Sequence, residues 1–163
     1  MLRVLFVCTE NAARSQIAEA LLREKGAGKF EAASAGSHPA SHIHPLAIAV
    51  MKEQGIGYHE QFPKGFDAVA DERWDLIITL CDRAREHCPA FRGQPVYAHW
   101  GMPDPAAVPG GEAAQKRAFL DAVMYLRQRI DYLLLVSYEG LERTARELRA
   151  SAHSESRAAC ATR

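Results

Sequence analysis

The chain has 163 residues, 48% of them hydrophobic and 25% charged, which are ordinary proportions for a globular protein large enough to bury a core. Twenty Lys and Arg residues balance twenty Asp and Glu residues, so no net charge favours a nucleic acid or a membrane surface as a partner. With no signal peptide and no long apolar run, the sequence predicts a single domain in the cytoplasm.

The first half of the chain alternates between predicted strands and predicted helices. Apolar runs at residues 2–7, 30–35 and 74–80 predict buried strands, and a shorter strand is expected at 95–98. Helical patterns cover residues 15–24 and 45–54 and end near glycines, and residues 66–72 are expected to hold a short helix. This alternation predicts an α/β fold, with about four parallel strands and helices on both faces of the sheet.

The second half of the chain is predicted to be mainly helical. A loop rich in Pro and Gly at residues 99–111 leads into a long helix that starts near Glu112. Its apolar stripe consists of Phe119, Ala122, Val123, Leu126, Ile130, Leu133 and Leu134. We assign residues 1–137 to the domain and residues 138–163 to a helical extension with a small, polar and disordered tail.

The segment between the first strand and the first helix has the composition of a nucleophile site. Cys8 follows the strand, Arg14 comes six positions later, and Ser15 stands at the helix start. Backbone N–H groups at a helix start, together with a guanidinium, are expected to lower the pKa of a thiol and to bind an anion. Arg14 can hold a tetrahedral oxyanion through two parallel hydrogen bonds. The predicted oxyanion-binding loop comprises Cys8, Thr9, Glu10, Asn11, Ala12, Ala13, Arg14 and Ser15.

The Cys-x5-Arg spacing by itself is weak evidence, and its strand–loop–helix context gives it force. The alternative is a buried structural Cys8 with an unrelated surface Arg14.

Two further cysteines lie after another predicted strand. Cys81 follows the strand at 74–80, at the same carboxyl edge of a parallel sheet as Cys8, where ligands bind in such folds. A helix between Cys81 and Cys88 would hold their Cα atoms about 10 Å apart, whereas a disulfide needs less than about 7 Å. A bond between them would therefore require the segment to unwind. The alternatives are an inert core Cys81 with an incidental Cys88, or a zinc site, although this spacing fits no common zinc pattern. We predict no metal site.

Asp104 lies in the Pro- and Gly-rich loop, directly before Pro105. A carboxylic acid above a thiolate could protonate a leaving oxygen, but Asp-Pro is also a frequent start of a turn. The sequence leaves both interpretations open.

Together these segments resemble the low-molecular-weight protein tyrosine phosphatases and their relatives, the thioredoxin-coupled arsenate reductases. The segment VLFVCTENAARSQIAEALL resembles their phosphate-binding loop and first helix, and SAG at residues 34–36 resembles the end of their second strand. DLIITLC with the following Cys88-Pro89 resembles the reductase branch, as does HWGMPDPA. The resemblance covers about residues 2–135 and implies a phosphatase-like α/β domain.

The resemblance implies a relay of three thiols. Cys8 would attack arsenate held by Arg14, with Asp104 assisting the loss of water or hydroxide. Cys81 would then attack the Cys8 sulfur, which releases arsenite. Cys88 would next attack Cys81, and the resulting Cys81–Cys88 disulfide would be reduced by thioredoxin or a similar dithiol.

The resemblance also bears on cofactors and on residues near the loop. The external reductant would be thioredoxin or glutaredoxin with glutathione, and no resident cofactor is required. Some reductase relatives carry a cation near the loop, which makes Asn11, Glu19 and Ser34 a candidate site for a monovalent cation. Asn11 would hold the shape of the loop, and Ser15 would stabilise the thiolate.

One loop residue departs from the family pattern. Glu10 stands where the family often has Gly, so it would be strained if this position has a positive φ. Its charge would also oppose anion binding unless the side chain turns away.

Two other functions remain open. A phosphatase would need Cys8, Arg14 and Asp104 but neither of the later thiols, although Ala106 gives no aromatic wall for a phosphotyrosine pocket. The third function is a non-catalytic module that binds arsenic or responds to redox state.

Overall fold

The computed structural model describes residues 1–58, 60–136, 140, 143–144 and 146–147. Its four parallel strands have the order β2-β1-β3-β4 and comprise β1 (Leu2–Cys8), β2 (Phe30–Gly36), β3 (Leu76–Thr79) and β4 (Val96–His99). The helices are α1 (Arg14–Lys25), α2 (Pro45–Glu53), α3 (Asp82–Glu86) and α4 (Gly111–Leu135), and short 3₁₀ turns occur at η1 (Phe66–Ala68) and η2 (Pro105–Ala107). The prediction of a four-stranded parallel sheet is confirmed.

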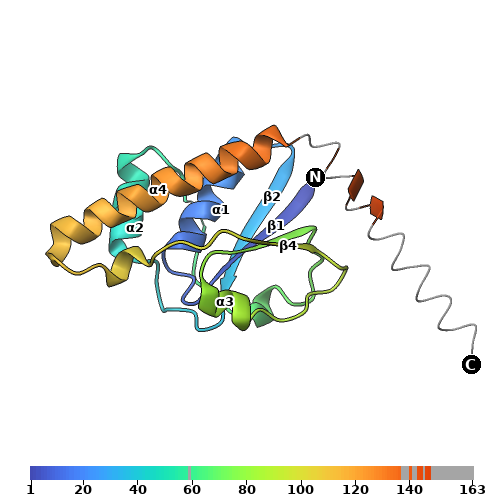
Figure 1. The fold of residues 1–163 in the computed structure, drawn as a ribbon, viewed down its shortest axis with the longest axis horizontal. Helices are drawn as coiled ribbons and strands as arrows, with labels where there is room; N and C mark the ends of the chain where they lie inside the picture. Colours follow the sequence, from blue (N-terminus) through green and yellow to red (C-terminus); the bar gives the residue numbers. More distant parts are fainter. Residues whose placement is uncertain (59, 137–139, 141–142, 145, 148–163) are drawn as a thin grey trace, which may run out of the picture.

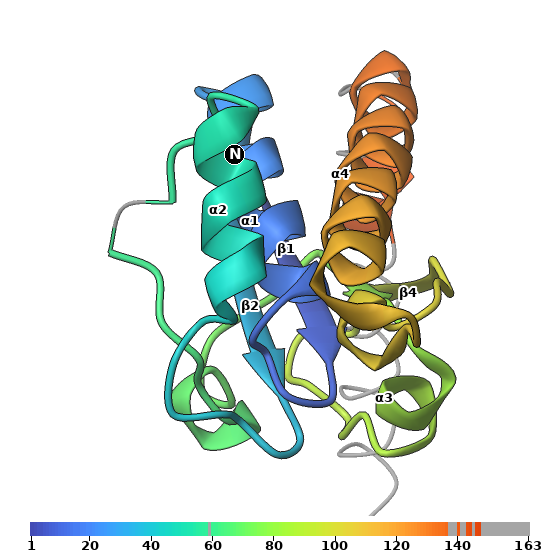
Figure 2. The ribbon, with the colours of Figure 1, turned by 90° about the vertical axis from the view of Figure 1, so that its left-hand side faces the viewer.

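The alternating side chains of β1 divide the core into two layers. Val4, Phe6 and Cys8 face the layer that contains α1, α2 and α4. Leu5 and Val7 face the opposite layer, which contains Ala84 of α3. Figures 1 and 2 show the same division, with the three longer helices on one side of the strands and α3 on the other. Helices therefore cover both faces, as expected.

The strand register brings the candidate residues to one edge of the sheet. Cys8 pairs with Gly36 of β2, Val7 pairs with Thr79 of β3, and Thr79 pairs with His99 of β4. Because the strands are parallel, their carboxyl ends meet at this edge, where ligands bind in open α/β sheets.

Several predicted element boundaries move by one or two residues. The third strand is shorter than expected because Trp74 lies outside it, buried, and donates its indole N–H to the Val69 carbonyl. The short helix expected at 66–72 is the turn η1, and Leu134 of the predicted stripe is only partly buried. The extension at 138–163 lies largely outside the described residues, so the division at residue 137 stays a prediction. Within the described part of the chain, no helix has the length and apolar character needed to cross a membrane.

Candidate active site

The loop between β1 and α1 turns sharply at Asn11, which has a φ of 50°. This is the left-handed region, which Asn tolerates better than most residues. The strain considered for Glu10 depended on a positive φ at that position, and this condition is not met. Glu10 has no positive φ, and its side chain is exposed; its carbonyl accepts a hydrogen bond from Ala40 N–H at 2.9 Å.

Gly36 at the end of β2 lets this loop pack against the sheet. A Cβ atom at this position would lie 2.5 Å from the Thr9 carbonyl oxygen and 2.9 Å from the Asn11 nitrogen. Only glycine fits there without moving the loop backbone.

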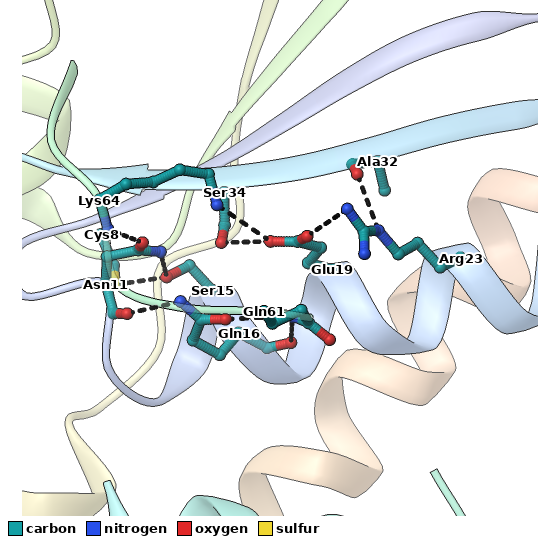
Figure 3. Close-up of polar contacts among 10 residues, drawn as sticks. All are labelled: Cys8, Asn11, Ser15, Gln16, Glu19, Arg23, Ala32, Ser34, Gln61 and Lys64. Carbon is teal, nitrogen blue, oxygen red and sulfur yellow. Dashed lines mark hydrogen bonds and ion pairs between the residues drawn. The ribbon is translucent and has the colours of Figure 1, made fainter. Parts of the chain in front are cut away.

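A buried polar network sets the orientation of the groups around Cys8 (Figure 3). The Asn11 amide oxygen accepts from Lys64 N–H at 2.8 Å, which leaves the amide nitrogen to donate to Ser15 Oγ, also at 2.8 Å. Because Ser15 accepts that bond, its own hydroxyl proton is free to point to Cys8 Sγ, which lies 2.9 Å away. Gln16 Nε2 fixes the turn further by donating to the Asn11 carbonyl at 2.8 Å.

Burial nevertheless raises the pKa of Cys8 above the ordinary value for a thiol. The side chain is 2% exposed, and loss of water disfavours the thiolate. The Ser15 hydrogen bond and the Arg14 charge lower the pKa but do not outweigh burial. The lowered pKa expected from the sequence is therefore wrong, because the helix start and the guanidinium do not compensate the cost of burying the thiolate.

Replacing Ser15 with Ala is expected to slow alkylation of Cys8 by iodoacetamide at pH 7 by about tenfold. The thiolate is the reactive form, and loss of the hydroxyl raises the pKa of Cys8 further, so less thiolate is present at neutral pH. The rate should rise with pH in both proteins, and the variant should need the higher pH. Alkylation is followed on the peptide that contains Cys8. Ser41→Ala, at an exposed position, is the control, and equal rates for Ser15→Ala and wild type would contradict this role.

Arg14 is 8% exposed and faces the loop that contains Asp104. Its NH1 donates to the Met102 carbonyl at 3.1 Å, and its NH2 lies 3.7 Å from Asp104 Oδ2. The other oxygen of Asp104 accepts from Ala106 N–H at 3.0 Å and caps η2. Asp104 therefore starts the turn that Asp-Pro favours and also directs a carboxylate oxygen to Arg14.

Cys81 lies at the start of α3 and contacts the oxyanion loop. Its sulfur accepts from Ala84 N–H at 3.4 Å and lies 3.4 Å from the hydroxyl oxygen of Thr9. Thr9 follows Cys8 directly, so this contact links the two cysteine positions. The sequence predicted that Cys8 and Cys81 lie at one edge of the sheet, but it did not indicate the contact between Thr9 and Cys81.

Cys88 lies just beyond the end of α3, which separates it from Cys81. Both are free thiols, as is Cys8. Partial burial raises the pKa of Cys88. The residue lines a pocket of about 480 Å³, together with Tyr97 and His99. Cys160 lies outside the described residues.

The candidate cation site of Asn11, Glu19 and Ser34 does not fit a bound cation (Figure 3). Glu19 is 1% exposed; its Oε1 pairs with Arg23 NH2 at 2.8 Å, and its Oε2 accepts from the Ser34 hydroxyl at 2.5 Å. Lys64 Nζ lies 3.9 Å from the same Oε2. Two protein cations thus neutralise the carboxylate, and the Asn11 oxygen is used by the Lys64 backbone.

Lys64 was not singled out in the sequence, because its proximity to Glu19 depends on the return of residues 61–65 along the edge of β2. Gly65 forms a bridge with Gly36 at this edge. The zinc alternative finds no support either, since the described residues contain no cluster of His, Cys, Asp and Glu that could hold a metal ion.

Lys64→Met is expected to lower the free energy of unfolding by about 1–2 kcal/mol, because it leaves a buried carboxylate with one cation fewer. Wild type should unfold at the same urea concentration in potassium chloride and in tetramethylammonium chloride, as expected if the protein supplies the charge. Lys52→Met, at an exposed position on α2, is the control. A marked stabilisation of wild type by potassium would contradict the assignment.

Comparison with known proteins agrees with this geometry. Residues 3–119 match the model of the low molecular weight phosphotyrosine protein phosphatase family. An arsenate reductase from Halalkalibacterium halodurans is 34% identical over 116 residues, which cover 71% of this chain and 83% of the relative.

Two solved structures share the fold. One is an arsenate reductase in the phosphate binding state, with 29% identity, a TM-score of 0.70, and coverage of 82% of this chain and 96% of the other. The second is a thioredoxin-dependent arsenate reductase from Corynebacterium glutamicum, with 31% identity, a TM-score of 0.64, and coverage of 88% of this chain and 63% of the other. With its loop, sheet order and matched residues, this chain belongs to the low-molecular-weight phosphotyrosine protein phosphatase family.

Proposed function

We propose that this protein is an arsenate reductase that uses Cys8, Cys81 and Cys88 in sequence and takes electrons from an external dithiol. The observation that carries the proposal is the position of Cys81, whose sulfur contacts Thr9 of the oxyanion loop at 3.4 Å. A phosphatase has no need of a second thiol at that place. The family relatives described above that are named arsenate reductases support the same choice.

The first step forms a bond between Cys8 sulfur and arsenic. The tetrahedral oxyanion would lie in the loop, where backbone N–H groups and the Arg14 guanidinium stabilise its charge. Asp104, 3.7 Å from Arg14 NH2 and 41% exposed at its side chain, can give a proton to the oxygen that leaves as water. Arsenic stays in its pentavalent state, and only an oxygen ligand is exchanged for sulfur.

The second step reduces arsenic. The Cys81 thiolate attacks Cys8 sulfur, the electron pair of the sulfur–arsenic bond goes to arsenic, and arsenite leaves. One disulfide between Cys8 and Cys81 balances the two electrons that arsenic gains. The contact between Cys81 sulfur and the Thr9 hydroxyl supports this step, because Thr9 directly follows Cys8 in the loop.

The third step moves the disulfide to the surface. Cys88 attacks Cys81, which restores the Cys8 thiolate and leaves a Cys81–Cys88 disulfide. Because α3 separates these two cysteines, this exchange needs the helix to unwind. An external dithiol then reduces the disulfide; the name of the Corynebacterium relative points to thioredoxin.

The proposal is tested by coupling arsenate to NADPH oxidation through thioredoxin and thioredoxin reductase. We expect arsenate-dependent oxidation, and little hydrolysis of para-nitrophenyl phosphate. Replacing thioredoxin by glutaredoxin with glutathione identifies the electron donor. Rapid ester hydrolysis without arsenate reduction by either donor would favour the phosphatase instead.

A further inference from the structure

His99 connects three elements at the carboxyl edge of the sheet. It is the last residue of β4; its Nδ1 lies 2.7 Å from Thr79 Oγ1 on β3, and its Nε2 lies 3.0 Å from Asp82 Oδ1 on α3. A carboxylate can only accept hydrogen bonds, so His99 donates from Nε2. The ring is thus fixed to the sheet on one side and to the first residue of α3 on the other.

Helix α3 has few other attachments. Ala84 is its buried residue, and Asp82 otherwise pairs with Arg85 of the same helix at 3.4 Å. In the described part of the chain, the bond between Asp82 and His99 is the side-chain hydrogen bond that ties residues 82–86 to another element. A short, mostly exposed helix with so few contacts is a segment that opens easily.

The ring of His99 also packs against the loop that serves Arg14. A Cβ atom at Gly101 would lie 2.7 Å from His99 Nε2, so the missing side chain at Gly101 is what admits the ring. The next residue, Met102, supplies the carbonyl that accepts from Arg14 NH1. His99 therefore lies between α3, which separates Cys81 from Cys88, and the loop whose Met102 carbonyl contacts Arg14.

We propose that His99 is a positioning residue: its bond to Asp82 stabilises the helical form of α3 and so disfavours the Cys81–Cys88 disulfide in the reduced protein. The inference rests on the relay proposed above. A continuous helix would hold the two Cα atoms about 10 Å apart, and α3 occupies residues 82–86 between them, so the helical form opposes the close approach that a disulfide needs. The bond between His99 and Asp82 stabilises that form and is lost when the helix unwinds. Removing the bond should therefore favour the disulfide.

The first test measures the equilibrium of the Cys81–Cys88 disulfide in a glutathione redox buffer. A Cys8→Ser, Cys160→Ser background leaves these two thiols to pair: two thiols and one oxidised glutathione give one protein disulfide and two reduced glutathiones. His99→Ala is expected to shift the equilibrium about two- to fivefold towards the disulfide, the range for a partly exposed polar contact. Gly101→Ala should do the same with His99 still present, because the new methyl group displaces the ring. His38→Ala, at an exposed histidine in another loop, should leave the equilibrium unchanged.

The second test follows amide hydrogen exchange in the reduced protein without any disulfide. The N–H groups of Arg85 and His87 bond to the carbonyls of Cys81 and Arg83 within α3. In His99→Ala and Gly101→Ala these amides should exchange about two- to fivefold faster than in wild type, which is the factor expected for the change in the disulfide equilibrium. Unchanged exchange in Gly101→Ala and His99→Ala would overturn the inference, whatever the thiols do. If the two variants exchange these amides faster but the wild-type protein does not reduce arsenate, the result contradicts the proposed function and leaves the role of His99 in α3 intact.

Discussion

Replacing Cys8 with Ser is expected to abolish arsenate-dependent NADPH oxidation, with a loss of about 10⁴-fold or more. A serine hydroxyl is scarcely ionised at neutral pH, and an oxygen–arsenic ester could not pass its electron pair to arsenic by thiol exchange. Ser15 Oγ lies 2.9 Å from Cys8 sulfur, so the substitution also removes the thiol that this hydroxyl contacts.

The two outer cysteines are expected to fail in different ways. Cys81→Ser should form the adduct but release no arsenite, whereas Cys88→Ser should release about one arsenite per protein and then stop with a Cys8–Cys81 disulfide. Arsenite release in a single turnover and the mass of the trapped disulfide distinguish the two variants. Cys160→Ser is the control and should keep nearly the full rate. Sustained turnover by Cys88→Ser would refute the three-thiol relay.

Replacing Arg14 with Lys is expected to lower kcat/KM for arsenate by about 10²–10³-fold while the protein stays folded. Lysine keeps the charge but loses the planar pair of N–H donors that hold two oxygens of a tetrahedral anion. The substitution also removes the contacts of Arg14 with the Met102 carbonyl and with Asp104, which tie the loop at residues 102–104 to the oxyanion loop. Initial rates over a range of arsenate concentrations give the change directly.

A matched control for Arg14→Lys is Arg92→Lys. Arg92 also faces a carboxylate, that of Asp71 at 3.6 Å, but both side chains are exposed. This variant should keep the wild-type rate. A similar loss of activity in both variants, or a normal rate in Arg14→Lys, would contradict the assigned role of Arg14.

The fold was predictable because its signals are local. Each strand is a short apolar run, each longer helix has its own apolar stripe, and the alternation of the two leaves few topologies for a parallel sheet. The errors lie at element ends. The strand predicted at 74–80 includes Trp74, but β3 begins at Leu76, and the Trp74 indole donates to the Val69 carbonyl.

The candidate site was predictable where its parts are contiguous in the chain. Cys8 and Arg14 lie within one strand–loop–helix unit, so the spacing and the pattern around it imply their proximity. The left-handed residue of this unit was not predictable, because Asn11 is held in that conformation by bonds from Lys64 and Gln16. These partners lie 53 and 5 positions away along the chain.

The sequence by itself determined the succession of strands and helices along the chain, the nucleophile loop and the presence of two later thiols, since these depend on residues close together in the chain. The tertiary structure alone decided the direction of the Cys8 pKa, the pairing of Glu19 with Lys64, and the contact of Thr9 with Cys81. The physical reason is that desolvation and charge interactions depend on burial and on distances of a few ångströms between groups far apart in the sequence. Such distances exist only once the chain has folded.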